Sequence, residues 1–557
     1  MMQRLNGLNN GYVGGSPEVP SCSISCGVIT PKKLHINALE INQWERPDYW
    51  LPLPQINPGE QKFSGLFAVF KGASGNTGAT ADSNFAAIRM VGNFIVDWGN
   101  GITRAYASNT TAAYTYNFED ISSATETPQG FRQVIIQAYP QTGATLTSLI
   151  LSDTTGFSFG TNLTGLAGLT LPTNTTYEWL DIKIAGASLS TLTIGNACAH
   201  MHKFEYVGRS SLTSIASMFD GCYSLERVVG TEWTSNVTNM SRAFQNCWSL
   251  RTLPLLNTQN VTSWFSCFFQ AYAFHTVPCF NTSNTTTTYQ MFRTCYSLND
   301  VPRFDMRKVT DCVQMFENCK SIESIPMFDI RSVRIMDGMV QSSGIKKFPM
   351  LDTSLVTGMS SLFNNCPKLK EMPPLNTSNV VSFGNFISGS GVEIVPDIDT
   401  SKGRNFGSFA RLATCLKRVP KMSFAGVTGP QGNTPVFQEM FFRCRSLLQV
   451  PEWDLSPVNH GPTSLGVGST GPFHSMFNDM GQIRVLGLKG LQRSIDLTNM
   501  TLSPTELNTF FTNLGGVTLY GGSTINITNV WGATAGAGYG VTCNRSIATS
   551  KGWTIIG

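Results

Sequence analysis

A single short phrase recurs through about half of this chain. The stretch MFENCKSIESIP ends at Pro326, and altered copies such as AFQNCWSLRTLP and MFRTCYSLNDVP end at Pro254 and Pro302. The spacing is about 24 residues, and about eleven units can be aligned, with the period lengthened twice by insertions. A catalytic motif needs to appear once, whereas a phrase repeated at a fixed period predicts a solenoid of stacked units. The other prolines of the series are Pro278, Pro349, Pro373, Pro396, Pro420 and Pro451.

Each unit reads as a turn followed by a short strand. Segments such as NTSNVVSF and DTSLVTGM begin with Asn or Asp followed by Thr, which favours an N-cap, so we expect one helical or 3₁₀ turn after them. Apolar residues such as Val237, Met240 and Phe244 would line one side of that turn. The strand should stop at the proline, because proline has no N–H to donate to a ladder. One unit cannot bury its own apolar face, so we expect neighbouring units to bury it in a continuous core.

One slot of the repeat explains most of the cysteines. Alanine or serine fills the same slot in other units, at Ala271, Ser343, Ser390 and Ala413. A slot that accepts Cys, Ser or Ala predicts a small buried side chain. Metal ligation is the alternative, but no histidine or acidic residue recurs beside the slot. The cysteines of this slot are Cys222, Cys247, Cys295, Cys319, Cys366 and Cys444.

The consensus MFxxCxSLxxIPxFDTSxVTxM resembles the BspA-like leucine-rich repeats, also called the DUF285 type, over roughly residues 206–490. The Met-Phe, Cys, Leu, Pro and Thr-Ser-Asn-Val-Thr elements recur together. The resemblance implies a right-handed leucine-rich solenoid used for adhesion or binding, of a kind found on bacterial and protist surfaces and in phage virion proteins. The units that end at Pro349 and Pro396 lack both the Cys and the Met-Phe pair.

Two further segments, residues 1–45 and 46–140, lie on the N-terminal side of the repeats. Residues 1–45, rich in Gly, Asn, Ser and Pro, predict an arm or linker, which in a virion protein of the kind that the resemblance implies would dock on the particle. Its Cys22 and Cys26 are either free thiols, a small clip or an intersubunit bond. Residues 46–140 predict a β-sandwich-like domain with a type I′ hairpin at Asn100-Gly101 and a strand FRQVIIQAYP. Its DWGNG segment is similar to the DWGDG signature of PKD-like modules. Asn100 replaces an Asp of that signature, which weakens any cation-binding role.

The two ends of the array need caps, because an uncapped solenoid exposes core and unpaired strand edges. Residues 141–205 alternate apolar and polar positions and predict the N-terminal cap. Residues 491–557 predict the C-terminal cap, in which Ser503 begins a short helix and TINITNV and WTIIG form strands. The C-terminal part resembles the ends of BspA-like phage and bacterial proteins, and the stretch that begins ERPDYW resembles structural proteins of marine phages.

Composition excludes several function classes. Charged residues make up 13% of the chain and the formal net charge is +4, without a Lys/Arg cluster that would indicate nucleic-acid binding. No apolar run approaches the roughly 18 residues that a membrane span needs. The N-terminal residues hold no apolar signal segment, so we expect any export to use another route. The 14 cysteines therefore do not predict a disulfide framework.

Residues that could carry chemistry have simpler explanations. His200 and His202 form an H-x-H pair that could hold a metal, but no ligand follows at the usual spacing, so a strand entering the repeats is favoured. Asp329 and Asp352 resemble a glycosidase pair, but Asn fills their slot elsewhere, so capping is favoured. We therefore predict no catalytic, cofactor-binding or metal-binding residue. The rows of Thr, Ser and Asn that face solvent would either bind sugars or solvate the repeats, and the insertions 424–437 and 454–473 predict surface loops.

These observations predict a non-enzymatic structural protein of a bacteriophage particle, a tail fibre or another exposed appendage that binds the host surface. The expected partners are other virion proteins, reached through the arm, and a host-surface glycan or protein. Neither nucleic acid binding nor membrane insertion is expected, and the residues leave a monomer and a homotrimer open. A bacterial cell-surface adhesin with the same repeats is one alternative, and a tail enzyme that degrades polysaccharide is another.

Overall fold

The computed structural model describes residues 44–71, 84–151, 178–427, 436–460, 473, 476–477, 479–480, 482–517, 523–534 and 542–557. Nearly all of the predicted arm, including Cys22 and Cys26, lies outside these residues, as do the centres of the two predicted insertion loops. The described part is mostly β. It contains two α-helices, α1 (Pro504–Asn513) and α2 (Ser546–Thr549), and several single 3₁₀ turns.

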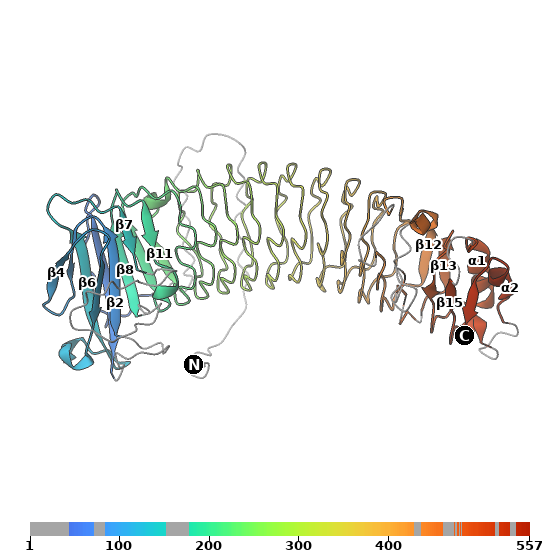
Figure 1. The fold of residues 1–557 in the computed structure, drawn as a ribbon, viewed down its shortest axis with the longest axis horizontal. Coiled ribbons are helices and arrows are strands. Elements are labelled where there is room, and N and C mark those ends of the chain that lie inside the picture. Colours follow the sequence, from blue (N-terminus) through green and yellow to red (C-terminus); the bar gives the residue numbers. More distant parts are fainter. Residues whose placement is uncertain are drawn as a thin grey trace. The chain divides into compact units, whose positions relative to one another are not determined.

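Two sheets form the N-terminal part of the described chain (Figure 1). One has seven strands in the order β11-β10-β8-β1-β6-β3-β4, and the other has four in the order β5-β2-β7-β9. Side chains of both sheets belong to one buried cluster, as expected for two sheets that pack face to face. The strands are β1 (Lys62–Phe70), β2 (Phe85–Val91), β3 (Phe94–Asp97), β4 (Thr103–Tyr106), β5 (Thr111–Thr115), β6 (Phe131–Pro140), β7 (Ser148–Ile150), β8 (Trp179–Ala185), β9 (Thr191–Thr193), β10 (Lys203–Val207) and β11 (Arg227–Val229).

Strand β8 joins the antiparallel part of the seven-stranded sheet to its parallel part. On one side it runs antiparallel to β1, and on the other it runs parallel to β10, which itself pairs in parallel with β11. All seven residues of β8 are buried, so the alternation predicted for residues 141–205 does not separate a buried face from an exposed one here. A second apolar cluster around Trp50 and Leu180 covers the other face. The same sheet crosses the boundaries that we expected at residues 140 and 205.

The predicted hairpin at Asn100-Gly101 exists, but its turn is not of type I′. The amide of Trp98 donates to the carbonyl of Ile102 at 2.9 Å, which leaves a three-residue loop. Gly99 and Gly101 have positive φ, of 73° and 85°, whereas Asn100 does not, and a type I′ turn needs positive φ at both central residues. A Cβ on Gly99 would lie 2.4 Å from the carbonyl oxygen of Ile135, so the loop needs glycine for space as well as for φ.

Between residues 214 and 418, each repeat pairs with the next through single parallel bridges between residues about 24 apart. Figure 1 shows these coils side by side. A second row of bridges joins the residues that stand two positions before the prolines. The short strands predicted before each proline are therefore mostly reduced to one bridged residue. One strand does not stop at proline: β12 (Gln449–Asp454) runs through Pro451, and its register with β13 (Val485–Lys489) shifts between Val450 and Trp453. The first row contains Ser214, Asn239, Ser263, Thr287, Asp311, Ile335, Gly358, Ser382 and Asn405.

The helical turn predicted after each Asn/Asp-Thr pair is a single β-turn, and a zigzag of turns follows it. In one repeat, the amides of Arg242, Phe244 and Asn246 donate to carbonyls of the next repeat at 2.8–2.9 Å. The intervening amides of Ala243 and Gln245 close turns inside their own repeat. A helix would direct every amide back along its own repeat, so neighbouring repeats compete with the helix for these donors.

The zigzag holds two residues of each repeat, four positions apart, in the left-handed region. In one repeat these residues are Gln314 and Asn318, with φ of 54° and 61°. Left-handed conformations cost a non-glycine residue roughly 1–2 kcal/mol. The amides of both residues donate to the next repeat at 2.9 Å, and these bonds hold the unfavourable backbone in place.

One apolar cluster continues from Phe63 in β1 to Trp553 near the C-terminus. Its centre is a file of parallel phenyl rings, Phe268, Phe292 and Phe316, whose neighbouring centroids lie 5.4 and 5.7 Å apart with planes within 6° of parallel. All three rings are fully buried, and Phe292 lies between the rings of the two neighbouring repeats. The expectation that repeats bury one another's apolar faces is confirmed along the described part of the array.

The C-terminal residues close the described chain as the sequence predicts. Ser503 Oγ accepts the amide of Glu506 at 3.2 Å and caps α1, which has proline at its start. The strands β14 (Ile495–Asp496), β15 (Thr524–Asn526) and β16 (Thr554–Ile556) pair in parallel and continue the direction of the repeats. Leu507, Phe510 and Phe511 of α1 are buried, and the helix packs against β13, α2 and the 3₁₀ turn η6 (Trp531–Ala533).

Candidate functional site

An open polar depression runs along the first repeats, and we call it the Thr–Asn groove. It has a volume of about 580 Å³, and Lys308 stands at the repeat farthest along it. No acidic residue is among the described residues that line it. The other residues of the groove are Ser211, Thr213, Asn236, Thr238, Asn260, Thr262, Asn284 and Thr286.

The groove arises because each repeat contributes one Asn and, two residues later, one Thr. Between Asn260 and Thr262 lies Val261, which is fully buried. Asn260 is part of the β-turn that the amide of Val261 closes on the carbonyl of Thr258, and Thr262 follows the valine, so burying Val261 leaves both polar neighbours outside the core. Stacking then sets equivalent side chains of successive repeats side by side, roughly 4.8 Å apart.

Hydrogen bonds along the stack leave the groove rich in acceptors. The hydroxyl of Thr262 donates to the carbonyl of Thr238 at 3.2 Å, and Thr286 donates to Thr262 at 3.1 Å. The amide nitrogen of Asn284 donates to the carbonyl of Gln259 at 2.8 Å. The threonine oxygens thus keep lone pairs, while the Lys308 ammonium donates to Asn284 Oδ1 at 2.7 Å. A surface of this kind can accept hydrogen bonds from a neutral ligand that carries many hydroxyl groups.

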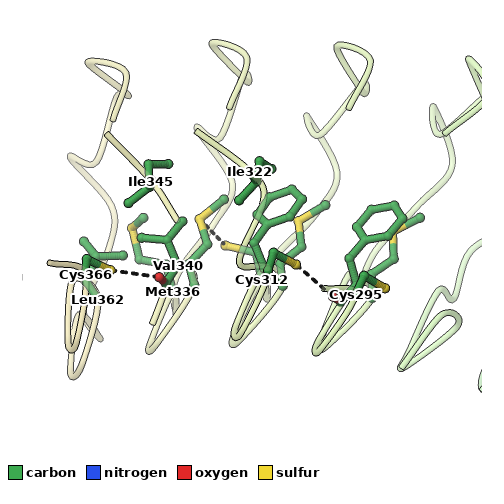
Figure 2. Close-up of a cluster of buried hydrophobic side chains, with 14 of the residues drawn as sticks. Cys295, Cys312, Ile322, Met336, Val340, Ile345, Leu362 and Cys366 are labelled. Carbon is green, nitrogen blue, oxygen red and sulfur yellow. Dashed lines mark hydrogen bonds between the residues drawn. The ribbon is translucent and has the colours of Figure 1, made fainter. Parts of the chain in front are cut away.

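The cysteine slot is a packing position, as predicted. Its six thiols are free and fully buried. Figure 2 shows Cys366 donating to the carbonyl of Val340 in the preceding repeat, at 3.0 Å. The thiol of Cys319 donates in the same way to Phe292, at 3.1 Å. A small buried group with a weak donor fits this position, which explains why Ser343 can also occupy it.

Burial also keeps these thiols protonated. Burial raises the pKa of Cys366 to about 11, and it raises the pKa values of Cys222 and Cys319 further. Thiolates, rather than thiols, bind metals and attack electrophiles. In the part of the chain that the structure describes, no group of three or more His, Cys, Asp or Glu residues is placed to hold a metal ion.

The two histidines of the H-x-H pair bind different partners. His200 Nδ1 lies 3.1 Å from Glu178 Oε2, whereas His202 Nδ1 lies 3.1 Å from Glu226 Oε1. The ring of Trp44 stacks on His202 with centroids 5.7 Å apart. The two histidines therefore contact different glutamates at the start of the repeats, His200 with Glu178 and His202 with Glu226. His35, His474 and the side chain of His460 lie outside the described residues.

Asp329 and Asp352 both cap turns. Oδ1 of Asp352 accepts the amide of Ser354 at 3.1 Å, and Asp329 accepts both the amide and the guanidinium of Arg331. The Arg331 guanidinium lowers the pKa of Asp329, and hydrogen bonds from Ser354 lower that of Asp352. Both carboxylates are therefore ionised acceptors, which is the state that a cap requires rather than that of a general acid.

We expect Asp352→Ala to lower the free energy of unfolding by about 1 kcal/mol, because the amide of Ser354 loses its acceptor. Asp352→Asn keeps an acceptor and matches the residue at Asn257 and Asn376, so it should cost less. Urea titrations at pH 7 would measure both losses.

The contribution of Asp352 should also depend on pH. The ionised carboxylate stabilises the folded state above its unfolded pKa of about 3.9, and this contribution disappears as the pH falls through the lower folded pKa. Acid should therefore destabilise the wild type more than Asp352→Asn, and equal losses for the two variants at pH 7 would contradict the capping role.

Other sites remain predictions. Residues 428–435 and 461–472, the centres of the two insertions, lie outside the described residues. A binding role for these two loops therefore stays a prediction. Within the described ranges, every helix is too short or too polar to span a bilayer.

The described residues thus define a mostly β protein with a central stack of repeats around a continuous apolar core. Residues 196–276, 238–348 and 342–399 match the family DUF285, which is described as a Mycoplasma protein of unknown function. These matches begin shortly before the predicted start of the repeats at residue 206, and they confirm the predicted DUF285 resemblance as far as residue 399. They cover less than half of the chain.

No curated protein matches this chain. One solved structure with a detectable likeness is titled "Crystal structure of TLR13-ssRNA13 complex", with 12% sequence identity and a TM-score of 0.16. That match covers 60% of this chain and 52% of the other, so it spans about half of that chain's length. A likeness at this TM-score carries no conclusion about fold or ligand.

Proposed function

We propose that this protein is a non-enzymatic adhesion protein, in which a right-handed BspA-like solenoid of about eleven coils presents a binding surface. The Thr–Asn groove is the observation that carries the proposal. It is a regular, acceptor-rich surface whose only charged lining residue, among those described, is Lys308, and it lies over a fully buried core. The slots occupied by Cys319, Asp352 and His202 are explained by packing, capping and a hydrogen bond to Glu226, which supports a scaffold rather than a catalyst.

The setting we propose is the surface of a bacteriophage particle. Residues 1–45 would attach the chain to other virion proteins, and a PKD-like sandwich within residues 46–140 would lead into the repeats. The low charge content, with polarity supplied by Ser, Thr and Asn, suits a surface that binds neutral glycans. Many copies on one particle would let weak contacts add up to firm adhesion. A bacterial cell-surface adhesin is the second candidate. The DUF285 match on the repeats favours a surface protein, but it does not distinguish a phage particle from a bacterial cell as the surface that carries it.

The test uses the full chain, labelled with a fluorophore, on a panel of bacterial cells analysed by flow cytometry. We expect saturable binding to a subset of strains, without release of soluble oligosaccharide from their capsule or lipopolysaccharide. Release that one carboxylate substitution abolishes would overturn the non-enzymatic proposal. Mass spectrometry of purified phage particles would detect the protein if the virion setting is correct, whereas its recovery only from cell envelopes would support the adhesin.

A further inference from the structure

Four aromatic side chains form an exposed file beside the repeats, which we call the aromatic ladder. Each follows directly after the cysteine slot of its repeat. Tyr223, Trp248 and Tyr296 are 39%, 43% and 43% exposed, and Tyr272 is half-buried. This slot lies in a different part of the repeat from the slots that form the Thr–Asn groove.

Packing does not explain the ladder. In later repeats the same slot holds Lys320, Pro367 and Arg445, none of which is aromatic. A slot so permissive needs no aromatic ring for stability. A contiguous exposed apolar surface on a folded protein commonly marks a site of interaction.

Two of the three neighbouring ring pairs are stacked, whereas the planes of Tyr223 and Trp248 are tilted by 39°. Tyr223 and Trp248 have centroids 4.2 Å apart, Trp248 and Tyr272 5.7 Å, and Tyr272 and Tyr296 5.1 Å. The two longer separations exceed the roughly 3.5–4.0 Å of direct contact between carbon atoms. Neighbouring rings are therefore displaced sideways, and parts of their faces and edges are accessible to a ligand. With repeats roughly 4.8 Å apart, the ladder is a strip of roughly 14 Å directed along the stack.

Charges near the ladder argue for a neutral ligand. Residues 214–302, which carry it, hold four acidic residues and four arginines, so neither sign dominates. Asp220 accepts amide groups of Asn246 and Gln245, at 3.0 and 3.2 Å. A surface that stacks bases of single-stranded nucleic acid needs a basic track for the phosphates, and acidic groups beside the rings would oppose it.

We propose that the aromatic ladder binds a linear neutral polysaccharide that lies along the stack. The apolar C–H faces of successive pyranose rings would pack on the aromatic rings, and their hydroxyl groups would bond to polar neighbours such as Ser249 and Ser297. A polymer of repeating units matches a site that itself repeats. This inference rests on the proposed adhesive function and names the ligand class for it.

The test compares the full-length wild type with Trp248→Lys and with Tyr272→Lys/Trp248→Lys, because lysine occupies this slot naturally at Lys320. Leu255→Ala is the matched control, since Leu255 is 59% exposed in the repeat of Trp248 but outside the ladder. Isothermal titration calorimetry would use neutral laminarin, mannan and dextran, acidic alginate and a thymidine oligonucleotide. Circular dichroism would check that each variant is folded.

We expect binding to at least one neutral polysaccharide, with affinity lowered about tenfold in Trp248→Lys, lowered further in the double variant and unchanged in Leu255→Ala. The inference is overturned if no neutral polysaccharide binds, if the ladder variants bind as tightly as the wild type, or if alginate or the oligonucleotide is the preferred ligand. The cell assay separates the two proposals. If Trp248→Lys binds cells as well as the wild type, adhesion stands and the ladder inference fails, whereas a wild type that binds no cells refutes adhesion itself.

Discussion

Replacing Phe292 with alanine should lower the free energy of unfolding of the repeats by about 3–5 kcal/mol. The ring is fully buried and lies between the parallel rings of Phe268 and Phe316. Its removal would therefore leave a cavity that borders three repeats at once. The neighbouring backbone cannot close this cavity easily, because cross-repeat hydrogen bonds hold the spacing between repeats.

Urea titration followed by circular dichroism would measure the loss, and amide hydrogen exchange would locate it. Met327→Ala is the matched control, because Met327 is an apolar side chain that is 58% exposed in the following repeat. Exposed substitutions usually change stability by less than about 0.5 kcal/mol. Similar losses in the two variants would show that the phenyl file is not the core of the stack.

The second large effect is expected at Cys319. We expect Cys319→Asp to destabilise the repeats by more than about 3 kcal/mol, because it places a carboxyl group in a fully buried slot without a partner. Cys319→Ala should cost only about 1 kcal/mol, the value of the hydrogen bond from its thiol to the carbonyl of Phe292. Alanine already fills this slot at Ala271 and Ala413.

Thermal melts of the two variants beside the wild type would check this ranking. A slot that serves packing tolerates alanine and rejects a charge. The opposite ranking, or a stoichiometric metal lost with Cys319→Ala and found by elemental analysis, would contradict the packing role. Both experiments probe the same requirement, that recurring residues of the repeat fill a shared dry core.

Local patterns of the sequence were sufficient for several elements. The segment FRQVIIQAYP is β6 over its whole length, and Ser503 caps α1. The recurrence of Cys319 and its equivalents predicted a small buried slot, and the recurrence of Asn or Asp at Asp352 predicted a cap. These features depend on side-chain size, polarity and short-range hydrogen bonds, which a sequence displays directly.

The backbone of the zigzag could not be predicted in this way. Arg242 and Gln290 adopt positive φ although neither residue type favours it, and local propensity predicted a helical or 3₁₀ turn instead. The donors that stabilise this backbone bond to the next repeat, about 24 residues away. A local pattern cannot report a hydrogen bond whose partner exists only after stacking.

For the candidate binding surfaces too, some features could be predicted from the sequence and others only from the tertiary structure. The sequence alone determined that the chain repeats, which positions are apolar, and that Thr and Asn recur at exposed positions. Only the tertiary structure decided that Thr262 and Asn284 share one groove and that Tyr223, Trp248 and Tyr296 lie in one offset file. The physical reason is that period and polarity act within one repeat, whereas a surface forms only where backbone hydrogen bonds set neighbouring repeats in register.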